Sequence, residues 1–319
     1  MGDPRDDIRA RLARPFQVVT GKGGVGRTLI SCALALRAAR SGERVLLVEV
    51  SANDNATRYL GVEPAVDTPK EVLPNLWLCR MTPAGALREY ALLILRFRAL
   101  YNLVFENRLV KYLLRSIPSL AEVTLMGKTW YHSTEQLKDG RPKYSRIVFD
   151  APATGHALTM LSVSRVVADT VPPGVLKTAA EKMAALIESE TGACLHVVAL
   201  PEEMPVNEAL ELSRAAETTL HTPAGVAFLN RWHAPLFRPE DAAVFQRLKA
   251  DPSPKVRPYV EAAEIRLLRQ KIEEEHTARL IREVNMPILS IEEAPADIPD
   301  PALLERVVEQ IEQGLGGAP

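Results

Sequence analysis

The chain of 319 residues is poor in cysteine and in net charge, and each shortage excludes a class of protein. Its three cysteines, Cys32, Cys79 and Cys194, are far apart and form no C-x-x-C pair. They therefore exclude a disulfide framework and a zinc clip, and predict buried, reduced thiols. The formal net charge is −1, so no global field attracts nucleic acid or an anionic membrane, and we expect no nucleic-acid partner.

Long hydrophobic runs are also missing. Residues 1–14 are dense in charge and lack the apolar segment of a signal peptide. No uninterrupted apolar run reaches the roughly 20 residues that a membrane span needs. We therefore expect a cytoplasmic protein without stable membrane insertion. The composition, 47% hydrophobic and 25% charged, is ordinary for a folded chain with a sizeable core.

The positive signals begin with a strand–helix–strand pattern. Residues 16–20 are rich in β-formers and lead directly into glycines, residues 29, 33 and 36 fall at helical spacing, and residues 44–50 form a second apolar run. This βαβ unit predicts an α/β fold with a mostly parallel, twisted sheet flanked by helices. Further strands are expected at 76–81, 146–150, 195–200, 226–230 and 287–291, and a last helix at 302–313.

Two helical stretches interrupt this single predicted domain of residues 1–319. The first insertion, about 83–132, is too apolar for a solvated helix, so it either lines a groove for a client or packs on its neighbours. The second insertion, about 234–285, is charged and has a break at Pro252 and Pro254.

The turn after the first strand has the spacing of a phosphate-binding loop. Main-chain N–H groups of such a turn surround phosphate oxygens, and the following helix adds its positive end. A glycine-rich turn without a ligand is the alternative. We expect ATP or ADP to bind here with Mg²⁺, through Gly21, Lys22, Gly23, Gly24, Val25, Gly26, Arg27, Thr28 and Leu29.

Two residues are candidate Mg²⁺ ligands, and a third departs from the usual sequence of a phosphate-binding loop. Thr28 opens the helix, where its hydroxyl can ligate Mg²⁺, and Asp150 ends a strand, as a Walker B carboxylate does. The usual lysine of the loop is replaced by Arg27, whose planar guanidinium is bulkier than an ammonium group. We therefore expect nucleotide binding to survive this change better than hydrolysis.

A longer resemblance rests on residues 147–158, I-V-F-D-A-P-A-T-G-H-A-L, which resemble the D-T-A-P-T-G-H-T-L switch of the ArsA/GET family of P-loop ATPases. Segments 118–122, 198–203 with Glu208, and 228–231 also resemble family elements, so the likeness covers about residues 16–315. It implies that the amide of Asn230 recognises adenine. The alternative for Asn230 is a turn cap at a strand end.

The resemblance also implies a dimer, because Lys22 matches the signature lysine that reaches the partner's nucleotide in this class. A solvated loop lysine is the alternative. The family's first switch, D-P-A-x-N, falls on residues 51–55, where Ser51 replaces the aspartate that positions water. Glu49 and Asp54 are the two candidates to substitute for it. His156, inside the second switch, is expected to have a positional role.

These observations favour a dimeric, nucleotide-dependent switch that acts on a protein client or partner, with impaired hydrolysis. Lys22, Arg27 and Asp150 are its candidate catalytic residues, and the dimer is either a homodimer or a heterodimer. A pseudo-ATPase scaffold paired with an intact sibling is the first alternative. A ParA-like partitioning ATPase is disfavoured by the near-zero charge, and arsenite pumping by the scattered cysteines.

Overall fold

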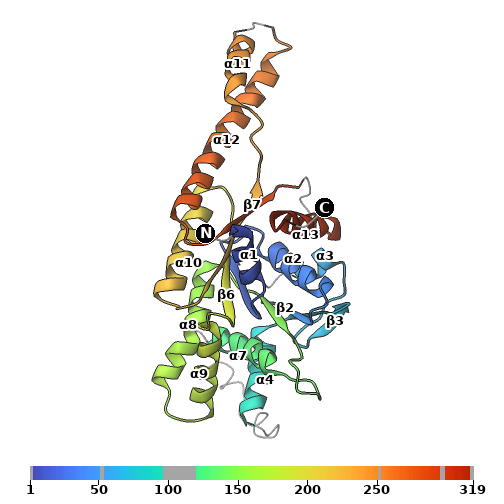
Figure 1. Ribbon diagram of the computed structural model, residues 1–319, viewed down its shortest axis with the longest axis vertical. Coiled ribbons are helices and arrows are strands. Elements are labelled where there is room, and N and C mark those ends of the chain that lie inside the picture. Colours follow the sequence, from blue (N-terminus) through green and yellow to red (C-terminus); the bar gives the residue numbers. More distant parts are fainter. Residues whose placement is uncertain (1–2, 51–53, 96–119, 251–252, 295–298, 317–319) are drawn as a thin grey trace.

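The computed structural model describes residues 3–50, 54–95, 120–250, 253–294 and 299–316 (Figure 1). Its centre is an eight-stranded sheet in the order β3-β4-β2-β5-β1-β6-β7-β8. All neighbouring strands are parallel except β3 and β4. The strands are β1 Phe16–Gly21, β2 Val45–Glu49, β3 Lys70–Leu73, β4 Leu76–Arg80, β5 Arg146–Asp150, β6 Ala193–Ala199, β7 Ala224–Trp232 and β8 Ile288–Glu292.

Helices cover both faces of the sheet, as Figure 1 shows for α2, α3 and α13 on one side and α8, α9 and α10 on the other. The described helices are α1 Pro4–Leu12, α2 Arg27–Arg40, α3 Asn55–Leu60, α4 Pro83–Leu95, α7 Leu120–Thr134, α8 Thr154–Thr170, α9 Val175–Ile187, α10 Glu203–Thr218, α11 Ala242–Lys249, α12 Arg257–Glu283 and α13 Pro301–Gly314, with a 3₁₀ turn at Pro239–Asp241.

The buried residues of the central strands alternate between the two faces of the sheet. In β2, Val45 and Leu47 pack with the α2 and α13 side, whereas Leu46 and Val48 pack with α7, α8 and α9. A sheet that is covered on both faces has near-continuous apolar strands, and this explains why β2 could be predicted from its run of Val and Leu. The expected α/β class with a mostly parallel sheet is confirmed.

Two short elements were not anticipated from the sequence. Strand β3 has only four residues, none of them buried, and it pairs antiparallel at the sheet edge. Helix α1 is highly charged, and only Ile8 and Leu12 of it are buried. Neither element presents enough apolar periodicity to be recognised without the rest of the fold.

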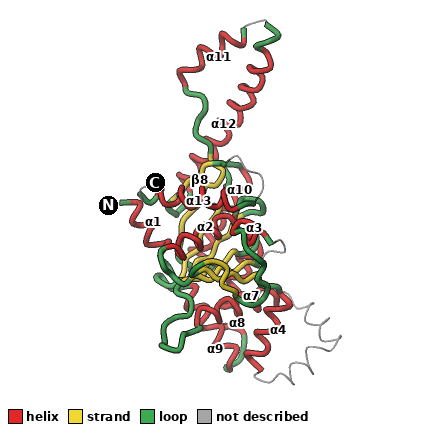
Figure 2. The backbone as a smooth tube through the Cα atoms, turned by 90° about the vertical axis from the view of Figure 1, so that its right-hand side faces the viewer, coloured by secondary structure: helices red, strands yellow, loops and turns green. Residues whose placement is uncertain are grey.

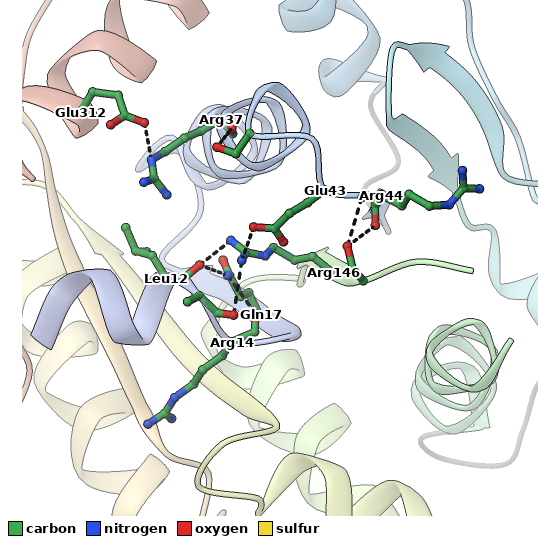
Figure 3. Close-up of polar contacts among 11 residues, drawn as sticks. Leu12, Arg14, Gln17, Arg37, Glu43, Arg44, Arg146 and Glu312 are labelled. Atoms are coloured by element: carbon green, nitrogen blue, oxygen red, sulfur yellow. Dashed lines mark hydrogen bonds and ion pairs between the residues drawn. The ribbon is translucent and has the colours of Figure 1, made fainter. Parts of the chain in front are cut away.

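Helix α1 is attached by side chains at the amino ends of the strands (Figure 3). The buried Arg146, at the start of β5, donates hydrogen bonds to the carbonyls of Leu12 and Ala13 and pairs with Glu43 at 2.8 Å. Gln17, in β1, donates a further bond to the Leu12 carbonyl at 2.7 Å. These contacts leave the opposite, carboxyl ends of the strands for the glycine loop.

The two insertions differ in their placement. In the first, α4 and α7 are described, and residues 96–119 between them lie outside the described residues, as do Pro118 and Ser119 of the family-like segment 118–122. In the second, β7 leads through the turn at Pro239–Asp241 into α11, and α12 returns to β8. Figures 1 and 2 show α11 and the outer part of α12 projecting away from the body.

Candidate functional site: the loop between β1 and α2

The glycine loop joins the carboxyl end of β1 to the start of α2. Two of its glycines are required by packing within the chain. A Cβ on Gly21 would lie 2.2 Å from the Val198 carbonyl oxygen, and one on Gly26 would lie 2.3 Å from Nδ2 of Asn230. Gly26 also caps α2 in the left-handed region, with φ of 93°, which favours glycine.

The other two glycines have no such packing reason within the described structure, although the φ of 86° at Gly24 also favours glycine. A Cβ on Gly23 or Gly24 would meet no described atom within 4 Å, and both residues are exposed. An added methyl group would instead fill the space in front of the loop's main chain. A phosphate group needs that close approach to the main-chain N–H groups, so the loop fits a polyphosphate ligand.

A carboxylate and two hydroxyls meet beside the loop. Oγ1 of Thr28 donates to Oδ2 of Asp150 at 2.7 Å, and Oγ of Ser31 donates to Oδ1 at 3.2 Å. Burial raises the pKa of Asp150 to about 6, although the two hydroxyls and the charge of Arg27 oppose this. Hydroxyl and carboxylate oxygens are hard donors, so Thr28 and Asp150 fit a Mg²⁺ ion that also contacts phosphate.

A second buried carboxylate lies next to Asp150. Glu49 ends β2 in direct register with Asp150 in β5. Its Oε1 accepts from the main-chain N–H groups of Asn55 and Ala56, at 3.2 and 3.4 Å, and so caps α3. Its Oε2 is buried without a hydrogen-bond partner among the described residues, and burial together with the charge of Asp150 raises the pKa of Glu49 to about 8.

The family's switch aspartate is replaced by Ser51, and Glu49 and Asp54 are the two candidates to substitute for it. Ser51, together with residues 52 and 53, lies outside the described residues. Asp54 precedes α3 and has Oδ1 buried without a hydrogen-bond partner in the described part of the chain. Glu49 is the one of the two candidates that lies in register with Asp150.

Arg27 points across the site toward the end of β5. Its guanidinium donates to the Ala151 carbonyl at 2.5 Å. Burial lowers the pKa of Arg27, and the negative charge of Asp150 partly offsets this. The arginine is therefore engaged with the main chain directly after Asp150.

Lys22 lies near Glu208 and Thr154, two residues of the family-like segments to which the sequence gave no individual role. Its Nζ is 3.9 Å from Oε1 of Glu208, and Oε2 of Glu208 accepts from Oγ1 of Thr154 at 2.7 Å. Glu208 thus joins α10 to the first residue of α8. The segments that meet here are far apart in the sequence, so spacing within one segment could not reveal the contact.

Asn230 lies beside the loop, at the end of the buried part of β7. Its Nδ2 donates to the Val25 carbonyl at 2.8 Å, and the side chain is 4% exposed. It shares a small cavity with Gly26, Leu29, Tyr59, Arg231, Pro299 and Leu303. The structure therefore places Asn230 against the glycine loop.

Comparisons with known proteins agree with this geometry. The sequence model of the family described as anion-transporting ATPase matches residues 15–173. The ATPase BagA of Mycobacterium tuberculosis is 32% identical over 240 residues, which are 72% of this chain and 68% of that protein. The chain belongs to the ArsA/GET family. It is accordingly a nucleotide-binding ATPase of the P-loop class.

More distant family members match shorter parts of the chain. ATPase GET3 of Podospora anserina is 27% identical over 208 residues, 63% of this chain and 57% of that protein. The arsenical pump-driving ATPase of Escherichia coli is 27% identical over 154 residues, 47% of this chain and 25% of that protein. The resemblance seen in residues 147–158 is thus confirmed at the level of the family.

Other features of this ArsA/GET member can now be placed. His156, in α8, has Nδ1 3.1 Å from Oε1 of Glu122 in α7, so it links the second switch to the first insertion. All three cysteines are buried and free, as expected. None of the helices within the described ranges has both the length and the apolar character to span a membrane.

Proposed function

We propose that this ATPase is a dimeric, cytoplasmic, nucleotide-dependent switch that binds Mg²⁺ with ATP or ADP, hydrolyses ATP slowly, and acts on a protein client or partner subunit. The observation that carries this proposal is the position of Arg27. Its guanidinium is held by the Ala151 carbonyl at 2.5 Å, while the loop that would hold the phosphates is intact.

In this proposal each group at the site has a separate task. The main-chain N–H groups of the loop hold the phosphates, and Gly23 and Gly24 keep the approach open. Thr28 and Asp150 hold Mg²⁺, which when bound would neutralise phosphate charge. The amide of Asn230 contacts the adenine base.

Two departures support slow hydrolysis. The planar guanidinium of Arg27 cannot place a point charge at a phosphate oxygen as lysine does. Ser51 replaces the aspartate that the family's switch uses for water, and Oε1 of the nearby, fully buried Glu49 is committed to the start of α3. Among the described residues, the end of β2 therefore offers no exposed carboxylate to orient an attacking water.

The retained Lys22 favours an assembly in which it serves a partner. A subunit with an altered Arg27 and an intact Lys22 would contribute the lysine to a second subunit and leave turnover to that subunit. A pseudo-ATPase scaffold paired with an intact sibling is therefore the second candidate. The first insertion, which begins with α4 and ends with α7, is the proposed place for a client.

Substitution of Arg27 by lysine tests the proposal. Calorimetry should show that Mg-ATP binds to both the natural chain and the Arg27→Lys variant. Turnover should rise at least about tenfold in the variant, since one charged contact to a transferring phosphate is worth about that or more. Equal turnover in both proteins would refute the role given to Arg27, and failure of both to bind Mg-ATP would refute the proposed function itself.

A further inference from the structure

The projecting part of the second insertion exposes much of the molecule's apolar surface. We call residues 236–283 the arm (Figures 1 and 2). Twelve large apolar side chains are strongly exposed among the described residues, and eight of them belong to the arm. They are Leu236, Val244, Leu248, Tyr259, Ile265, Leu268, Ile272 and Ile281. Concentrated exposure of this kind marks an interaction surface.

Three of these residues form a stripe on one face of α12. Ile265, Leu268 and Ile272 are 58%, 62% and 44% exposed, and their spacing of three and four residues places them in line. Val260 and Gln270, on other faces of the same helix, are buried. The stripe therefore faces away from the arm's own contacts.

The arm is held together by its own hydrogen bonds and is packed into the body at its base, so this exposure belongs to the folded chain. The Gln270 side chain accepts from the N–H groups of Leu236 and Phe237, at 3.0 and 3.2 Å, and donates to the Phe237 carbonyl at 3.0 Å. Near the base, the fully buried Leu280 packs in the core that α10 forms with β6 and β7. The stripe thus lies on a helix whose base is packed in the body.

The charge of the arm indicates what covers the stripe. The arm as a whole has ten basic and nine acidic residues, a net charge of +1, but its outer part, residues 242–272, has seven basic and three acidic residues, a net charge of +4. Within the described structure, Arg269 and Lys271 have no ion-pair partner, and they lie in the sequence between Leu268 and Ile272. Packing the stripe against the stripe of a second copy would bring two pairs of Arg269 and Lys271 together, which is unfavourable.

A cavity at the base of the stripe favours a protein helix over a lipid bilayer as the partner. Ile272 and Arg269 line a cavity of about 330 Å³ together with Leu200, Pro201, Arg231 and His233, and with the carboxylates of Glu202, Glu273 and Glu293. Glu273 pairs with Arg266 at 3.3 Å and Glu293 lies 4.0 Å from Arg231, and these contacts offset their charge. An amphipathic helix can lie along α12 and insert a side chain into this cavity, as helices do in grooves. A lipid bilayer would contact the tip or one side of the arm but would not enter the cavity.

We propose that the arm binds an acidic amphipathic helix of a partner protein, whose apolar face covers Ile265, Leu268 and Ile272 and whose carboxylates contact Arg269 and Lys271. This inference goes beyond the proposed nucleotide chemistry and does not depend on it.

Two synthetic helical peptides of about 20 residues, with the same Leu and Ile stripe, test the proposal with the full chain. One has Glu and the other has Lys at the flanking positions, and binding is followed by fluorescence anisotropy. The Glu peptide should bind and the Lys peptide should not. Leu268→Asp should weaken binding at least about tenfold, since it places a charge in the covered stripe. Val166→Asp, at an apolar residue of α8 that is also strongly exposed, should leave binding unchanged.

A charge reversal distinguishes specific docking from general stickiness. The double variant Arg269→Glu, Lys271→Glu should lose the Glu peptide and gain the Lys peptide. Equal binding of both peptides to the natural chain, or binding that ignores Leu268→Asp, would overturn the proposal. So would binding to phosphatidylserine vesicles without binding of the Glu peptide, or self-association in ultracentrifugation that Leu268→Asp abolishes.

Discussion

Substituting Gly23 by alanine separates the loop's ligand role from its structural role. A Cβ at Gly23 meets no described atom within 4 Å, and Gly23 is not among the glycines with positive φ. The folded chain should therefore tolerate the change, and stability should stay the same or rise by about 0.4–1 kcal/mol because the unfolded chain loses freedom. The new methyl group would, however, occupy the space that a phosphate needs. Overpacking of that size costs about 1–3 kcal/mol, which weakens binding by about 5-fold to 150-fold.

Gly42 gives the matched control. A Cβ added there would likewise meet no described atom within 4 Å, but its φ is 87° and it lies at the far end of α2. Gly42→Ala should lower stability by about 1 kcal/mol and leave nucleotide affinity unchanged. Urea unfolding and calorimetry with Mg-ATP measure the two quantities for both variants. A ligand role for Gly23 is refuted if Gly23→Ala binds Mg-ATP as tightly as the natural chain, or if its lost affinity is matched by lost stability.

Three further outcomes are expected. Arg146→Ala should destabilise the chain by about 3 kcal/mol in urea unfolding, because it removes the bonds to the Leu12 and Ala13 carbonyls and leaves Glu43 without its partner. The exposed Arg141→Ala should have no effect. Without Mg²⁺, the free energy of unfolding should fall as pH rises from about 4.5 to about 8, because the folded chain keeps the proton of Glu49 over this range and the unfolded chain does not. A flat profile would contradict the burial of this carboxyl. So would a profile that Glu49→Gln leaves unchanged. Lys22→Ala should leave Mg-ATP affinity unchanged and lower the turnover of the assembled dimer; an effect on affinity alone would argue against a role in the partner's site.

The central strands could be predicted because their signals are local and strong. Strand β5 was expected at its observed bounds, since an apolar run that ends in Asp150 is distinctive. Strands β6 and β7 begin two residues earlier than expected, and β7 extends to Trp232, because pairing with neighbours lengthens a strand beyond its apolar centre. The glycine loop could be predicted as well, because its glycines are closely spaced and come directly after a strand.

Contacts between distant segments could not be predicted in this way. Lys128 reads as an ordinary charged residue in the sequence, yet it is 1% exposed, with Nζ bonded to the Asp67 carbonyl and 3.0 Å from Glu89. The bond between Glu208 and Thr154 likewise depends on how α10 packs beside α8. Such partners are set by tertiary packing, and the resemblance to a family supplied only the segments, not the contacts.

The measurement that tests the central claim most directly is calorimetric titration of the natural chain with ATP at millimolar concentration in the presence of magnesium. We predict saturable binding to one site per chain, weakened when magnesium is removed, because Thr28 and Asp150 then lack the ion that joins them to the phosphates. No heat of association, either for the chain alone or for the chain with a partner subunit, would contradict the proposed nucleotide site.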